Sequence, residues 1–116
     1  MKELSTLNDY QKKALTYAKY PENLTYIYPC IYPCIGLSGE AGEVSEKVKK
    51  ILRDKGGIMT DQDRTEIAKE LGDVLWYVSV MAKKIGFSLS DIANMNVSKL
   101  ESRKQRNVLG GSGDNR

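Results

Sequence analysis

Residues 61–85 read DQDRTEIAKELGDVLWYVSVMAKKI, and helical spacing is more regular here than elsewhere in the chain. Thr60 or Asp61 can cap the first turn and Gly86 follows the last, so the spacing predicts a helix that ends near Ile85. Its apolar side chains recur every three or four residues and form one stripe: Ile67, Leu71, Val74, Val78, Met81 and Ile85. A stripe of this length requires other helices to cover it.

Three further segments carry helical periodicity, over residues 7–19, 33–55 and 88–107. Pro21 follows the first, Gly56-Gly57 ends the second, and Ser88-Leu89-Ser90-Asp91 resembles a capping box for the last. We therefore predict an all-α, four-helix-bundle-like single domain over residues 1–109. Residues 110–116 form a Gly-rich tail that is either flexible, as its composition indicates, or folded over bound phosphates through Arg116.

The composition excludes several classes of site. The chain of 116 residues has no histidine, which removes His-based catalysis and the usual zinc sites. Its net charge of +3 is too small to predict binding to a nucleic acid polymer. No apolar run approaches the roughly 18 residues that span a membrane. Cys30 and Cys34 have no companion zinc ligands, so we predict reduced thiols in a cytoplasmic protein.

A short duplication precedes the second predicted helix. Tyr28-Pro29-Cys30-Ile31 is followed at once by Tyr32-Pro33-Cys34-Ile35. We interpret it as an insertion in the loop before that helix. A Cys-x-x-x-Cys redox or metal pair is the alternative interpretation.

Four carboxylates fall on the flanks of two apolar stripes. Residues that are three apart lie on one side of a helix, so Glu40 and Glu43 converge on the second helix and Glu70 and Asp73 on the third. Glu46 lies on the far side and is expected in solvent. Four carboxylates at the edge of a core require a cation, and hard oxygen ligands suit Mg²⁺ or Mn²⁺. The alternative is that both pairs are ordinary surface acids bonded to lysines.

The last predicted helix adds a basic face, formed by Asn96, Lys99, Arg103 and Arg106. This face could hold phosphates, or it could simply complement the helix dipole. On the third helix, Trp76 and Val80 lie opposite the core stripe, which predicts a buried helix or a subunit contact, and hence a homodimer or a tetramer built from dimers. Gly36, Gly39 and Gly42 recur every three residues and predict close approach of another helix or of substrate.

Together these segments resemble the MazG-like nucleoside triphosphate pyrophosphohydrolases of the all-α NTP pyrophosphatase superfamily. The resemblance rests on Tyr10-Gln11, on residues 36–46, on residues 70–77, and on Asn96 with Lys99 and Arg103. It implies hydrolysis of an NTP or dNTP between the α and β phosphates, giving a monophosphate and pyrophosphate.

The resemblance also implies roles for single residues. Mg²⁺, held by Glu40, Glu43, Glu70 and Asp73, would bind the triphosphate and lower the pKa of an attacking water, and one of these carboxylates would act as base. The implied substrate contacts are Tyr77, Asn96, Lys99, Arg103 and, near the base, Gln11.

Two other functions stay open at this point. One is a helical module that binds a partner protein through its acidic and basic faces without a reaction. The other is a specialised superfamily enzyme, similar to a dUTPase or to a phosphoribosyl-ATP pyrophosphohydrolase.

Overall fold

The computed structural model describes residues 3–20 and 29–116, and its regular elements are four helices. They are α1 (Leu7–Leu15), α2 (Ile31–Asp54), α3 (Asp61–Lys84) and α4 (Leu89–Gln105). The predicted all-α class is confirmed. Pro21 and Tyr28, which entered the prediction of the first loop, lie outside the described residues.

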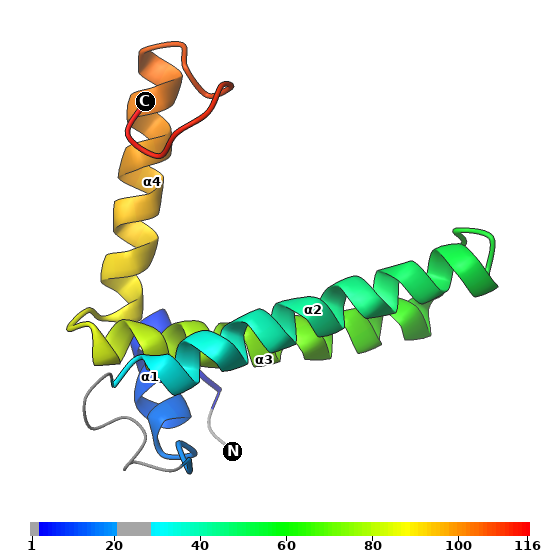
Figure 1. Cartoon of the computed structure of the whole chain (residues 1–116). Helices are drawn as coiled ribbons and strands as arrows, with labels where there is room; N and C mark the ends of the chain where they lie inside the picture. The colour runs from blue at the N-terminus through cyan, green and yellow to red at the C-terminus, as the bar shows by residue number, and fades with distance from the viewer. Residues whose placement is uncertain (1–2, 21–28) are drawn as a thin grey trace.

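Helices α2 and α3 form an antiparallel hairpin, the most extensive contact between elements (Figure 1). The turn between them depends on Gly56 and Gly57, whose φ angles of 59° and 81° belong to the left-handed region that glycine tolerates. The Gly57 amide donates to the Ile51 carbonyl at 3.1 Å and so closes the end of α2. Thr60 and Asp63 then form a capping box that begins α3.

An ion pair locks this turn. The Lys55 ammonium donates to the Asp63 carboxylate at 2.6 Å. This hydrogen bond, followed by the one from the Thr60 amide, lowers the pKa of Asp63 to about 2. One carboxylate thus caps α3 and ties it to the end of α2.

Two helix boundaries differ from those predicted. Helix α1 ends at Leu15 rather than near residue 19, and the amides of Thr16 and Tyr17 bond to carbonyls three residues back in a tighter last turn. Helix α2 begins at Ile31, so the second copy of the duplicated segment lies inside the helix. The duplication is therefore not confined to the loop: the helix begins before the predicted Pro33 and includes the whole second copy, in which Pro33 needs no backbone donor because it lies in the first turn.

Gln11 joins three helices at one buried point. Its side-chain amide nitrogen donates to the carbonyls of Ser79 at 3.1 Å and Phe87 at 3.3 Å. Its side-chain oxygen accepts from the Leu89 amide at 3.0 Å, in the first turn of α4. Gln11 is only 6% exposed. Its amide therefore gives partners to the Phe87 carbonyl and the Leu89 amide, which lie where the chain passes from α3 to α4, and ties both to the Ser79 carbonyl of α3.

The second apolar surface of α3 packs against α1. Val80 is fully buried, and the Trp76 indole nitrogen donates to the Ala14 carbonyl at 3.0 Å. The stripe predicted to face the core is less covered, since Leu71 and Ile85 are each 52% exposed. Of the two alternatives predicted for Trp76 and Val80, a buried helix or a subunit contact, the structure shows the buried helix.

Helix α4 stands away from the hairpin and meets α1 and α3 only near its own beginning (Figure 1). The radius of gyration is 17.1 Å, against about 13 Å for a compact domain of this length. The chain is therefore extended, and long faces of its helices are exposed on both sides of α4.

Two other predictions concern the cysteines and the membrane-spanning capacity of the helices. Both cysteines, Cys30 and Cys34, are free thiols. Within residues 3–20 and 29–116, no helix combines the length and the apolar character that crossing a membrane requires.

We expect Gln11→Ala to lower the free energy of unfolding by about 2 to 3 kcal/mol, because buried main-chain groups lose their partners. The matched control is Gln105→Ala, which removes an exposed glutamine from α4 and should change stability by less than about 0.5 kcal/mol. Urea denaturation measures both. Equal losses in the two variants would contradict a bridging role for Gln11.

Candidate metal centre

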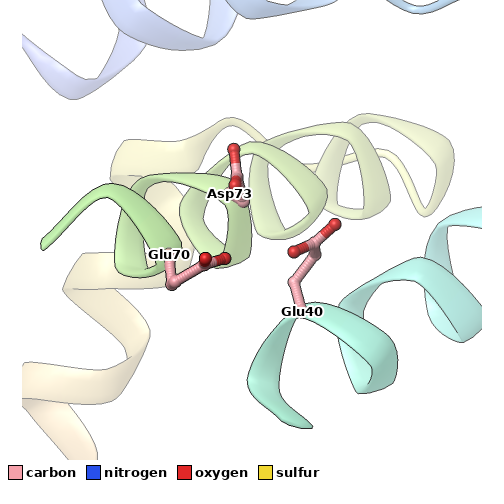
Figure 2. Close-up of side chains that lie close together, drawn as sticks. All are labelled: Glu40, Glu70 and Asp73. Atoms are coloured by element: carbon pink, nitrogen blue, oxygen red, sulfur yellow. The ribbon is translucent and has the colours of Figure 1, made fainter. Parts of the chain in front are cut away.

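Three carboxylates from two helices meet beside the hairpin (Figure 2). Glu40 comes from α2, and Glu70 and Asp73 come from α3. One oxygen from each lies within 4.8 Å of the others. A separation of this size lets three ligand oxygens share one small cation.

The close approach of the helices here depends on Gly36. A Cβ atom on this residue would overlap the ring of Tyr77, which packs directly across the glycine. Added Cβ atoms on Gly39 and Gly42 would meet nothing within 4 Å. The predicted close packing of the three glycines is therefore found at Gly36, while the other two are open within this chain.

The carboxylates repel one another. Burial raises the pKa of Glu40, and the charges of Asp73, Glu70 and Glu43 raise it further. Lys47 offers partial compensation, since its ammonium lies 3.8 Å from the Glu70 carboxylate. One lysine against three acids leaves a net negative site.

Glu43 and Glu46 lie differently. Glu43 is exposed and does not belong to the three-carboxylate cluster, although its charge acts on Glu40. Glu46 pairs with Lys49 at 2.7 Å and with Lys50 at 3.6 Å. The hydrogen bond from Lys49 is the main cause of the lowered pKa of Glu46. Three of the four carboxylates predicted to hold a metal thus lie close together. Glu46, which was predicted to lie away from them in solvent, pairs with surface lysines.

Comparison with known proteins identifies the family. Residues 34–108 match the MazG nucleotide pyrophosphohydrolase domain, a span that contains all three clustered acids. The chain belongs to the MazG family. "Gene 37 protein" of Mycobacterium phage L5 is 53% identical over 85 residues, covering 73% of this chain and 75% of that protein. No solved structure matches.

An aromatic cavity of about 270 Å³ adjoins the MazG carboxylates, with Asp73 on its wall. Its lining is Leu4, Tyr10, Lys13, Ala14, Tyr17, Gly72, Asp73 and Trp76. The sequence did not predict this cavity. Its walls come from α1 and α3, and neither segment contains a pattern that indicates where the two helices cross. The aromatic residues at Tyr10, Tyr17 and Trp76 were the available clue.

The remaining predicted substrate residues are distributed over the structure. Tyr77 is half-buried, and its pKa is raised by burial and then by the charges of Tyr32, Glu40 and Asp73. Gln11 is engaged in the fold, as described above, with both ends of its amide hydrogen-bonded.

The basic residues of α4 form a separate group. Asn96 and Lys99 line a cavity of about 310 Å³ together with Ile92, Met95 and Asp114. Arg103 is buried one turn further along. The cavity contains none of the three clustered carboxylates, so one chain does not bring the acids and the α4 cations together in a single pocket.

We expect Glu40→Gln to raise the melting temperature of the metal-free protein by about 1 to 4 °C, because it removes one of three repelling charges. A carboxyl whose folded pKa is raised contributes stability that is present at low pH and is lost as pH rises through that pKa. The gain should therefore be larger at pH 7 than at pH 4.

Glu46→Gln is the control, since it removes the same charge from a site where lysines stabilise it. It should leave the melting temperature unchanged or slightly lower. Thermal denaturation with EDTA measures both variants, and destabilisation by Glu40→Gln at pH 7 would contradict a repulsive cluster.

Proposed function

We propose that this protein is a metal-dependent nucleotide pyrophosphohydrolase, which cleaves an NTP or dNTP between the α and β phosphates. The observation that carries the proposal is the convergence of Glu40, Glu70 and Asp73 within a chain of the MazG family. Three acids that lie this close, with one lysine nearby, need a cation to hold them together at neutral pH.

The donor set fits Mg²⁺ or Mn²⁺. It consists of carboxylate oxygens alone, which are the ligands that hard divalent cations prefer, and it offers no thiolate or imidazole. Glu40, Glu70 and Asp73 would hold the ion, with Glu43 close enough to add its charge. When bound, such an ion neutralises phosphate charge and lowers the pKa of a nearby water.

The side chains of the protein would perform the remaining steps. A water oxygen attacks the α phosphorus, the bond to the bridging oxygen breaks, and pyrophosphate leaves with that oxygen. One of the clustered carboxylates accepts the proton of the attacking water. The aromatic walls at Tyr10, Tyr17 and Trp76 offer the nucleoside flat apolar surfaces within reach of Asp73. Tyr77 packs across Gly36, one helical turn before Glu40, where it would orient the substrate.

The phosphates would be bound by Asn96, Lys99 and Arg103. These side chains share a face of α4, and cations stabilise the charge that develops on phosphates during transfer. Gln11, which the resemblance places near the base, is excluded from the proposed contacts because its amide is already occupied. Both cysteines are free, so we place the reaction in the reducing cytoplasm.

We further propose that two copies of the chain assemble, directly or within a tetramer. Leu71 and Leu75 leave an apolar face open on α3, and Val97 and Leu100 do so on α4. Burying such faces is favourable at about 25 cal/mol per Å². Assembly would also form a site that contains both the acids and the cations, because the α4 cations of one copy could then meet the carboxylates of the other.

Pyrophosphate release from a panel of NTPs and dNTPs tests the activity. We expect release with Mg²⁺ or Mn²⁺ and none with EDTA. Glu70→Gln and Asp73→Asn should each lower kcat/KM by at least about 100-fold, whereas Glu46→Gln should stay within about twofold of the parent. Circular dichroism shows that the variants remain helical. Folded protein that releases no pyrophosphate from any nucleotide, with metal bound, would overturn the proposal in favour of a binding module.

The mass in solution tests assembly. Leu71→Lys should shift the protein toward monomer, because a charge would enter the apolar face. Ile58→Lys is the control, since Ile58 lies in the α2–α3 turn and is already 72% exposed. Light scattering coupled to size-exclusion chromatography gives both masses. A monomeric parent protein at micromolar concentration would contradict the proposal.

A further inference from the structure

Residues 108–116, here called the strap, fold back beside the last turns of α4 (Figure 1). Arg116 holds the strap closed, since its guanidinium donates at 2.6 to 3.2 Å to four main-chain carbonyls, those of Val108, Leu109, Gly110 and Gly113. Gly111 and Gly113 allow the reversal with φ angles of 93° and 88°. The tail that its composition predicts to be flexible is thus ordered by its own last residue.

The strap delivers one carboxylate to the basic face of α4. Asp114 accepts from the Lys99 ammonium at 2.8 Å and from the Arg103 guanidinium at 3.2 Å. Arg103 also donates to the Asp114 carbonyl. Hydrogen bonding to Lys99 is the main cause of the lowered pKa of Asp114, so this carboxylate is ionised at neutral pH.

The strap covers Arg103 without satisfying it. Arg103 is 6% exposed, and its Nε has no hydrogen-bond partner in the part of the chain that the structure describes. One carboxylate faces two cations, so the group keeps a net positive charge. The adjoining cavity, walled by Asn96, Lys99 and Asp114, gives an outside ligand access to Lys99, and Asp114 separates it from Arg103 by bonding to both cations.

We propose that the strap is an internal competitor of the substrate, in which Asp114 occupies Lys99 and Arg103 until a polyphosphate displaces it. Carboxylate and phosphate oxygens are acceptors of the same kind for ammonium and guanidinium groups. This inference rests on the assignment of Lys99 and Arg103 to phosphate in the proposed function, and it adds a resting state that nucleotide must open.

The energetics favour a strap that opens. The Asp114 side chain is 75% exposed, and ion pairs of exposed groups are weak because water screens them. A polyphosphate brings several negative charges where Asp114 brings one. Opening also frees the buried Nε of Arg103 to find a partner. The hydrogen bonds of Arg116 close the strap again after the anion leaves.

Titration calorimetry with inorganic tripolyphosphate, in EDTA, tests the competition without metal or catalysis. Asp114→Asn keeps the shape of the side chain and removes its charge, and it should tighten binding about two- to fivefold. Lys99→Gln should weaken binding by a similar factor or more. Glu101→Gln is the control, because it removes one exposed carboxylate from the same helix without touching the strap.

A second readout follows the strap itself. Tripolyphosphate should speed amide hydrogen exchange in residues 108–116 of the parent protein and leave the α2–α3 hairpin unchanged. Melting curves show whether Asp114→Asn is folded, and Asp114→Ala serves if it is not.

Binding by Asp114→Asn that is weaker than, or equal to, that of Glu101→Gln would overturn the proposal, and so would a parent protein that does not bind tripolyphosphate. The activity has its own test. Competition without pyrophosphate release defeats only the proposed reaction, and release with no effect of Asp114 defeats only the strap.

Discussion

Repulsion among Glu40, Glu70 and Asp73 is the constraint on which the rest of this structure depends. Two helices must approach closely enough to bring three like charges within 4.8 Å, and the fold has to supply the force that holds them there. The glycine at position 36 permits the approach, because the ring of Tyr77 occupies the space of a side chain. At the far end of the hairpin, the pair of Lys55 with Asp63 fixes the two helices to each other. Packing along the whole length of α2 and α3 thus offsets the electrostatic repulsion among the three acids, as expected of a site built for a ligand.

Much of this arrangement could be predicted from spacing alone. Capping residues at Thr60 and Ser88 place the starts of α3 and α4, and intervals of three residues put each acidic pair on one side of its helix. Spacing does not say which flank of a helix a neighbour covers. Trp76 was therefore predicted in a buried helix or a subunit contact, and only the structure shows that it packs on α1. Gln11 entered as a substrate contact through the resemblance, and the structure adds that its amide bridges three helices. Both residues lie at helix crossings, which depend on contacts between residues more than 60 positions apart. For the tail, the sequence left open a flexible end and a fold through Arg116; the structure has the fold, but with Arg116 bonded to main-chain carbonyls of the tail.

The molecule separates its two kinds of charge. The acids lie midway along the hairpin, and the cations lie on a helix that leaves the hairpin near one end (Figure 1). Each group has a partial internal partner: Lys47 faces Glu70, and Asp114 faces Lys99 and Arg103. A metal complex of a nucleoside triphosphate carries both a cation for the first group and anions for the second. In an assembly where the α4 cations of one copy meet the carboxylates of the other, the same ligand would relieve both sets of unmatched charge, which unites the metal centre, the basic face of α4 and the strap in one account.

The most direct test of this account is a crystal structure of the protein grown with Mn²⁺, with the ion located by its anomalous scattering. We predict one peak or more within coordination distance of carboxylate oxygens from Glu40, Glu70 and Asp73 together. Strong peaks elsewhere, with these three side chains turned apart into solvent, would contradict the claim that the hairpin is built around a divalent cation.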